Sequence, residues 1–135
     1  MELNEEERKN LEVFLSSLRQ HSELKRWTLE SEPVLSLPGL DIYPERYKAY
    51  HGEKEIELNI KEFTLLCLLV SNKGRVLTYG QMYQKVWNEE PFGNENIAVG
   101  SHVRSMRQKL YAVYPDPPFT ISCIRNVGYR FETDS

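Results

Sequence analysis

The chain has 135 residues, a net charge of −3 and two cysteines, a length that accommodates one domain with an appendage. Its 40% of hydrophobic and 27% of charged residues predict a real core and exclude wholesale disorder. No apolar run approaches the roughly 18 residues that span a bilayer, and the acidic start does not match a secretory signal. We therefore expect a cytoplasmic protein without membrane contact, in which Cys67 and Cys123 are buried free thiols.

The net charge conceals an uneven distribution along the chain. Residues 1–35 carry eight acidic and five basic side chains, whereas residues 96–131 carry five basic side chains and one acidic one. Attraction to phosphates requires a local basic surface, and the whole-chain sum is a weaker guide. The C-terminal third is therefore the place to expect a nucleic-acid surface.

The N-terminal residues predict a helix over about 5–26. Asn4 is its cap, and three glutamates follow in the first turn. Its apolar stripe must be buried, either by docking onto the following domain or by pairing with a second copy. Residues 31–38, which contain two prolines, are typical of a linker. We therefore predict an N-terminal helix and linker over residues 1–35 and a separate domain over residues 36–135.

Short extended segments follow this linker. Apolar and polar residues alternate in them, which is typical of an antiparallel sheet with one wet face. The expected strands are residues 39–43, 46–51 and 55–58, with turns at 44–45 and 52–53.

Two capping boxes then mark the starts of two helices. Asn59 with Glu62 opens a helix that is apolar over most of its surface and is therefore the expected core helix. Thr78 with Gln81 opens the next helix, which carries Trp87 toward the core. The residues just before Thr78 are too few to predict more than an isolated β-bridge.

The third helix of this series is predicted over about 96–112. One stripe is apolar and consists of Val99, Val103, Met106 and Leu110. The opposite face holds no carboxylate and consists of Ile97, Ser101, Arg104, Ser105 and Gln108. Such a face suits an element laid against a phosphate-lined groove; an ordinary solvated helix face is the alternative.

The chain ends in a predicted hairpin, with strands over 119–125 and 129–133 around a turn at 126–128. Ile121 and Ile124 are three residues apart, so either a bulge or the turn must absorb the break in alternation. A helix with a basic face followed by a basic hairpin can engage a duplex twice. The helix enters the major groove, and the tip reaches the adjacent minor groove or the backbone.

Several motifs occur in one order along this region: Ile56-Glu57-Leu58-Asn59, Asn72-Lys73-Gly74-Arg75-Val76-Leu77-Thr78, Val86-Trp87, His102-Val103-Arg104 and Ile124-Arg125-Asn126-Val127-Gly128-Tyr129-Arg130-Phe131. Residues 39–132 thereby resemble the winged-helix effector domain of OmpR/PhoB-type response regulators, which act in phosphorelay signal transduction. The resemblance implies an α+β winged helix-turn-helix: a small N-terminal antiparallel sheet, three helices and a C-terminal β-hairpin wing, here preceded by an extra helix. It implies binding to double-stranded DNA, often as a homodimer on direct repeats.

The candidate DNA-binding residues come from the third helix and the wing: Ile97, Ala98, Ser101, His102, Arg104, Ser105, Arg107, Gln108, Arg125, Asn126 and Arg130. Arg104 can grip a guanine or clamp a phosphate. Ile97 and Ala98 can contact thymine methyl groups or simply be exposed, and the wing arginines can contact DNA or only be solvated. The resemblance also implies that one loop touches RNA polymerase, through Asn88, Glu89, Glu90 and Phe92.

The chain departs from the family pattern at four points. Ile97 replaces an arginine, and Asn126 stands where glycine is usual. Gly100 lies inside a helix, which favours either close helix packing or close approach to DNA. Finally, 35 leading residues are too few to hold a phosphoacceptor domain.

These patterns favour a sequence-specific transcription regulator that binds duplex DNA. The alternative is a winged-helix interaction module whose acidic N-terminal helix binds a protein partner. An enzyme is not expected, because no His, Cys and carboxylate cluster has metal-ligand spacing and no phosphate loop or nucleophile motif occurs. We accordingly expect no metal and no cofactor.

Overall fold

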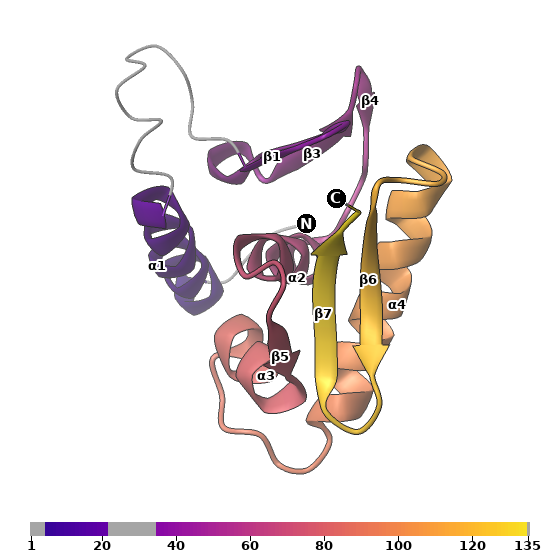
Figure 1. Cartoon of the computed structure of the whole chain (residues 1–135). Helices are drawn as coiled ribbons and strands as arrows, with labels where there is room; N and C mark the ends of the chain where they lie inside the picture. Colours follow the sequence, from indigo (N-terminus) through magenta and orange to yellow (C-terminus); the bar gives the residue numbers. More distant parts are fainter. Residues whose placement is uncertain (1–4, 22–34, 135) are drawn as a thin grey trace.

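The computed structural model describes residues 5–21 and 35–134. Within these ranges the helices are α1 (Glu5–His21), α2 (Ile60–Ser71), α3 (Tyr79–Trp87) and α4 (Glu95–Val113). The strands are β1 (Leu35–Leu37), β2 (Leu40–Tyr43), β3 (Lys48–His51), β4 (Lys54–Glu55), β5 (Val76–Thr78), β6 (Phe119–Ile124) and β7 (Gly128–Thr133). Figure 1 shows the β1–β4 sheet above α2, with α4 and the β6–β7 hairpin on one side of it.

The N-terminal sheet has the order β1-β2-β3-β4 and is antiparallel throughout. The predicted strands at 39–43 and 46–51 are confirmed, although a short 3₁₀ turn at Pro44–Arg46 delays the second of them. The predicted strand at 55–58 is reduced to β4. The linker prediction for residues 31–38 is wrong over Leu35–Leu37, because these residues pair with β2 as an edge strand.

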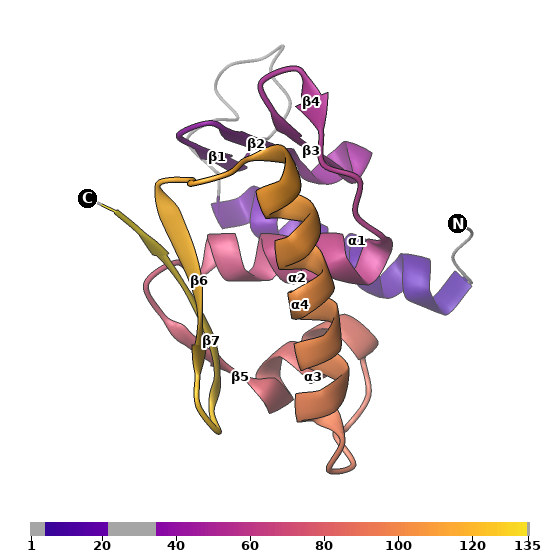
Figure 2. The same cartoon turned by 90° about the vertical axis from the view of Figure 1, so that its right-hand side faces the viewer.

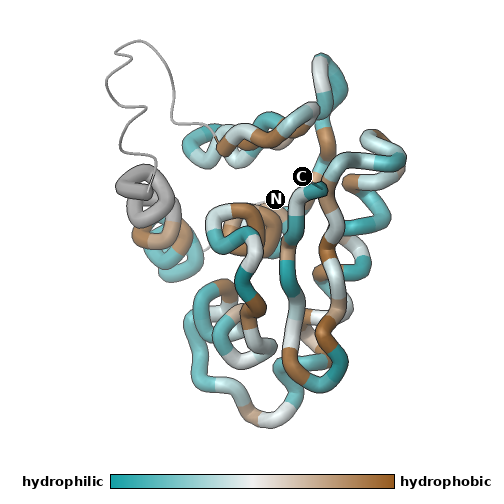
Figure 3. The backbone as a smooth tube through the Cα atoms, viewed as in Figure 1, coloured by the Kyte–Doolittle hydropathy of each residue, from teal (hydrophilic) through white to brown (hydrophobic). Residues whose placement is uncertain are grey.

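Helix α2 is the core helix that its apolar composition predicts. Nine consecutive residues from Glu62 to Val70 are buried, and Figure 3 shows this hydrophobic segment surrounded by the other elements. Both capping boxes are confirmed. The Asn59 side chain accepts from the Glu62 N–H at 2.9 Å, and Thr78 and Gln81 exchange the same pair of bonds at the start of α3.

The second sheet joins segments that are far apart in the sequence, in the order β5-β7-β6. Residues Val76–Thr78 are more than the isolated bridge expected, since three successive residues pair with β7. The register of β6 with β7 runs without interruption from Phe119 to Ile124. The turn, and no bulge, therefore absorbs the irregular spacing of Ile121 and Ile124.

Helix α1 docks onto α2 and α3. Its Leu11 is 5% exposed, and Glu7 lies 3.9 Å from Lys61 of α2. Figures 1 and 2 place α1 and α4 on opposite sides of α2. The predicted extension of this helix over 22–26 lies outside the described residues, and the domain boundary at residue 35 stays a prediction.

The two cysteines differ in their surroundings. Cys67 is fully buried, as expected, and burial raises the pKa of its thiol. The prediction of a buried Cys123 is wrong: it is exposed on β6, the edge strand of its sheet, although its partner Tyr129 in β7 is buried. The Cys123 Sγ lies 3.7 Å from the Tyr79 hydroxyl.

Over the described ranges, no group of three or more His, Cys, Asp or Glu side chains could hold a metal ion. No helix in these ranges is long and apolar enough to cross a membrane.

Candidate nucleic-acid interface

Helix α4 has one buried and one exposed stripe, in agreement with its periodicity. Val99, Val103, Met106 and Leu110 are fully buried. On the opposite side the exposed stripe consists of Asn96, Ile97, Ser101, Arg104 and Gln108. This stripe contains no carboxylate. Helix α1 docks on the far side of α2 from α4 (Figure 2). The described part of the acidic N-terminal segment, residues 5–21, therefore does not cover the exposed stripe.

Ser105 and Lys109 do not belong to the exposed stripe, because both bond to Glu62 at the start of α2. Ser105 donates to one carboxylate oxygen, and the Lys109 ammonium lies 2.6 Å from the other. Glu62 is 1% exposed and also accepts from the backbone N–H of Asn59. Burial raises the pKa of Glu62, but the bonds from Lys109, Ser105 and Asn59 outweigh burial, so its pKa lies below the ordinary value.

Arg107 and His102 also have protein partners. The Arg107 guanidinium donates to the backbone carbonyl of Ile121 at 2.9 Å and so ties α4 to strand β6 of the wing. The Nδ1 of His102 donates to the carbonyl of Ala98 at 2.9 Å, since a carbonyl oxygen can only accept. The His102 ring meets the ring of Trp87 edge-on, with centroids 5.1 Å apart. Trp87 is half-buried at this junction, and Ala98 is half-buried beside it.

Gly100 is buried and faces the wing. A Cβ built there would lie 3.6 Å from the hydroxyl of Tyr129 in β7, an ordinary van der Waals contact. Neither expectation for Gly100 is met, because it packs against a strand rather than against a helix or an open surface. Burial raises the pKa of Tyr129, and the nearby charges of Arg107 and Arg104 oppose this rise. Arg107 lies on the wing side of α4, as its bond to Ile121 shows.

The wing presents one free arginine and one paired arginine. Arg125 is exposed at the turn and has no ion pair among the described residues. Beside it, Asn126 is exposed and adopts the left-handed conformation with φ of 63°, which asparagine tolerates better than most residues. Arg130 lies in β7, opposite Ser122, and its Nε is 3.0 Å from a carboxylate oxygen of Glu132.

The loop between α3 and α4 is partly held by its acidic residues. Glu89 accepts a bond from the Tyr83 hydroxyl at 3.4 Å, and Glu90 accepts one from Gln84 at 3.1 Å. Asn88 ends α3 in the left-handed conformation, with φ of 56°. Phe92 is 82% exposed, so this loop displays a large apolar side chain to solvent.

The sequence interpretation missed a polar hollow of about 390 Å³ between the wing tip and the starts of α3 and α4. Thr78, Gly80, Glu95, Asn96 and Asn126 are among its lining residues, and none of the described lining residues is basic. At the start of α3 the backbone N–H groups of Tyr79 and Gln81 already donate to the Val127 carbonyl and to the Thr78 side chain. The capping box at Thr78 locates this helix start in the sequence, but only the fold shows that it faces the wing.

Comparison with known proteins agrees with this geometry. Residues 53–131 match the family model described as "Transcriptional regulatory protein, C terminal". The chain is 38% identical over 111 residues to the alkaline phosphatase synthesis transcriptional regulatory protein PhoP of Bacillus subtilis, covering 82% of this chain and 45% of that protein. It is 28% identical over 117 residues to the regulatory protein VanR of Enterococcus faecium, covering 87% and 50%. The chain thus spans about half the length of these relatives.

Solved structures show the same fold. The DNA-binding domain of CpxR from Escherichia coli superposes with a TM-score of 0.66 at 28% identity, covering 76% of this chain and 99% of that one. The Klebsiella pneumoniae RstA DNA-binding domain, solved with its RstA box, gives a TM-score of 0.63 at 22% identity, covering 73% and 96%. The β1–β4 sheet, helices α2–α4 and the β6–β7 wing are the parts of a winged helix. The chain therefore belongs to the family of OmpR/PhoB-type winged-helix DNA-binding domains of transcriptional regulatory proteins.

Proposed function

We propose that this chain binds specific duplex DNA and regulates transcription, with α4 in the major groove and the β6–β7 turn on the adjacent minor groove or backbone. The observation that carries the proposal is the exposed, carboxylate-free stripe of α4 beside the wing. A helix fits the major groove, where each base pair presents a distinct pattern of donors and acceptors. The relatives named as transcriptional regulators support this reading.

In this proposal the free side chains contact DNA. Arg104 reads a base or clamps a phosphate, Ser101 and Gln108 bond to bases or phosphates, and Ile97 and Ala98 meet thymine methyl groups. Arg125 and Asn126 contact the backbone from the wing.

The side chains with protein partners are proposed to act indirectly. Ser105 bonds to α2, and Arg107 bonds to β6, so these residues hold α4 at a fixed angle to the wing. His102 packs on Trp87, and Arg130 pairs with Glu132. Their replacement should disturb DNA binding through the position of α4 or the wing rather than through a lost contact.

Three further assignments belong to this proposal. Regulators that read direct repeats bind as dimers, so we propose that this chain binds DNA as a homodimer. We also propose that it acts in the cytoplasm.

We further propose that the α3–α4 loop touches RNA polymerase, because Phe92 is exposed there beside Asn88, Glu89 and Glu90. Replacement of Phe92 by alanine should leave DNA affinity unchanged and lower transcription from a bound promoter in a reconstituted assay.

The direct test is selection of bound fragments from a genomic DNA pool, followed by affinity measurements at several salt concentrations. Specific sites should be enriched, and affinity should fall steeply between about 50 and 200 mM salt because phosphate contacts release counterions. Arg125→Ala should weaken binding to all sequences and lower the salt slope by about 1. The control Arg8→Ala, on exposed α1, should change neither quantity. Absence of any enriched fragment would overturn the proposal.

A further inference from the structure

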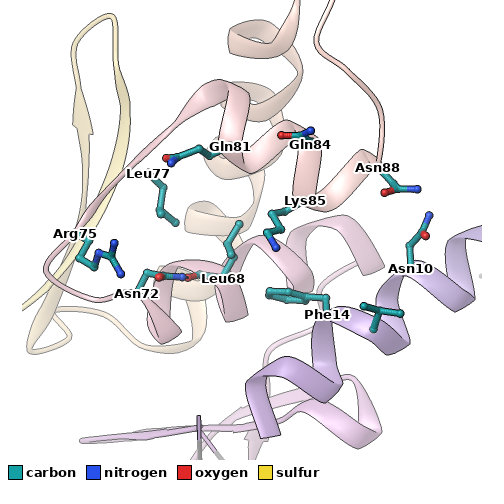
Figure 4. A pocket seen from close by; sticks show the side chains of 11 residues that line it. Asn10, Phe14, Leu68, Asn72, Arg75, Leu77, Gln81, Gln84, Lys85 and Asn88 are labelled. Carbon is teal, nitrogen blue, oxygen red and sulfur yellow. The ribbon is translucent and has the colours of Figure 1, made fainter. Parts of the chain in front are cut away.

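A groove of about 630 Å³ opens on the side of the molecule away from the exposed stripe of α4, between α1, α2, β5 and α3. Figure 4 shows side chains from all four elements turned toward it. Phe14, Leu68 and Leu77 form an apolar floor. The α1 docking described above uses Leu11, so it does not fill this groove. The groove is a surface that the proposed DNA contacts leave unused.

The charges at the groove are all of one sign. Arg75 and Lys85 line it, and none of the described residues that line it is acidic. Both side chains are exposed, and neither forms an ion pair among residues 5–21 and 35–134. The remaining lining residues are amides, which can bond to any polar surface, and Val13, which lies in the α1 wall of the groove. An apolar floor with a cationic rim fits an occupant that is apolar at its centre and acidic at its edge.

Helix α1 itself carries that complementary pattern. Val13 is 68% exposed and therefore lacks the burial that an apolar side chain in this position gains from a partner. Glu6, seven residues earlier, lies on the same stripe of the helix and is exposed. Over residues 5–14, α1 has four acidic and two basic side chains. Lys9, four residues before Val13, shares this face and is also exposed, so the match in charge depends on the acidic excess of α1 as a whole and the match in apolar character on Val13.

We propose that the groove receives α1 of a second copy, so that two chains form a two-fold dimer in the absence of DNA. In such an isologous interface, α1 of each copy lies along α1 of the other. Val13 of each copy then reaches the apolar floor of the other, and Glu6 faces Arg75 and Lys85. Because α1 and α4 lie on opposite sides of α2 (Figures 1 and 2), both DNA-binding surfaces stay open in the dimer.

The test is sedimentation of the full chain without DNA over about 1–300 μM, a range that suits a small interface. Wild type should show a reversible monomer–dimer equilibrium with a dissociation constant of about 10–100 μM. Val13→Glu should remain monomeric at the highest concentration, because it places a charge against the apolar floor. Glu12→Lys is the matched control: Glu12 lies about 100° around the helix from Val13 and does not line the groove, so this variant should dimerise like wild type.

Charge exchange separates the proposed contact from a general loss of structure. Glu6→Lys alone and the double variant Arg75→Glu with Lys85→Glu should each weaken self-association about tenfold, since like charges then meet. An equimolar mixture of the two variants should form a heterodimer, because both of its contacts pair opposite charges. A misfolded variant cannot be restored in this way.

A wild-type chain that stays monomeric up to the highest concentration overturns the proposal. A dimer that is unaffected by Val13→Glu and by the charge changes overturns it as well, because another surface must then pair. Neither result bears on DNA binding by one copy, which is measured separately with a single half-site. The dimer surface and the proposed regulatory function can therefore fail independently.

Discussion

The polar residues of α4 fall into two groups. Those on the exposed outer stripe face solvent, whereas those beside the buried stripe bond to other parts of the protein. On the outer stripe, Ser101 and Arg104 are exposed, and within the described part of the chain their side chains form no hydrogen bond or ion pair that would compete with a ligand. On the flanks, Ser105, Arg107 and Lys109 each bond to α2 or to the wing. Residues of the same type, three or four positions apart, thus either present a surface or fix its position. The difference teaches that charge along a helix does not identify the contacting residues.

The C-terminal end of α4 continues the anchored side. The hydroxyl of Tyr114, just beyond the helix, donates to the carbonyl of Pro38 at 2.9 Å. The Tyr114 ring stacks on His51 of β3 with centroids 3.7 Å apart. One end of the helix is therefore held by the N-terminal sheet, while the other end, at Asn96 and Ile97, remains exposed. A helix anchored in this manner presents its free end in a fixed orientation.

The largest effect is expected from Glu62→Ala, which removes the residue of α2 to which the anchored side of α4 bonds. The change removes the acceptor of Ser105 and Lys109 together with half of a capping box. We expect a loss of about 3 kcal/mol in the free energy of unfolding, measured by urea denaturation. Glu57→Ala, at an exposed acid nearby, should lose less than about 0.5 kcal/mol. Equal losses in the two variants would show that Glu62 does not anchor α4.

The Glu62 carboxyl group should also make the free energy of unfolding depend on pH, with a smaller loss than in Glu62→Ala. Because the pKa of Glu62 is lower in the folded chain than its ordinary value of 4.5, its contribution is fully present above that value. The contribution is lost as the pH falls from 4.5 through the folded pKa, where the carboxylate becomes protonated. Glu62→Gln should therefore lose less stability than wild type between neutral and acid pH. Parallel pH profiles of the two proteins would contradict this assignment.

A moderate effect is expected from Arg107→Ala. The change removes the bond to the Ile121 carbonyl and so loosens α4 from the wing. We expect a loss of about 1.5 kcal/mol in the free energy of unfolding. Affinity for any DNA that contacts both elements should fall as well. An unchanged melting temperature would show that the bond from Arg107 to Ile121 does not stabilise the fold.

The smallest effect, and one of opposite sign, is expected from Gly100→Ala. An added Cβ meets only the Tyr129 hydroxyl at 3.6 Å, so the helix gains propensity without a clash. The free energy of unfolding should rise by about 0.5–1 kcal/mol. Gly128→Ala is the contrasting variant, since its Cβ would overlap the Leu77 carbonyl, and it should destabilise the wing. A destabilised Gly100→Ala variant would indicate that the helix and wing pack more tightly than the structure shows.

The sequence predicts those features that depend on short-range spacing. The capping boxes at Asn59 and Thr78 join residues three apart, and the buried stripe of α4 follows from its helical period. The exposed half of the outer face, with Ser101 and Arg104, follows from the same period. These features need no knowledge of the tertiary structure.

The features that the sequence could not predict depend on distant partners. Strand β5 is only three residues long and pairs with β7, about fifty residues later. Ser105 lies at the edge of the polar face, and only the position of Glu62 on α2 turns it inward. Cys123 continues the apolar alternation of its strand, yet it is exposed on the edge strand of the sheet while its partner Tyr129 in β7 is buried. In each case a local pattern is correct and the neighbouring element decides its outcome.

The measurement that tests the central claim most directly compares Arg104→Ala with wild type on a selected duplex, across a series of salt concentrations. Arg104 is exposed on the outer stripe, so its removal should leave the melting temperature unchanged. Affinity for the preferred site should fall about 10- to 100-fold, with discrimination lost at one base pair if the arginine reads a guanine. Unchanged affinity at every salt concentration, in a fully folded variant, would contradict the account of α4 as the DNA-reading element.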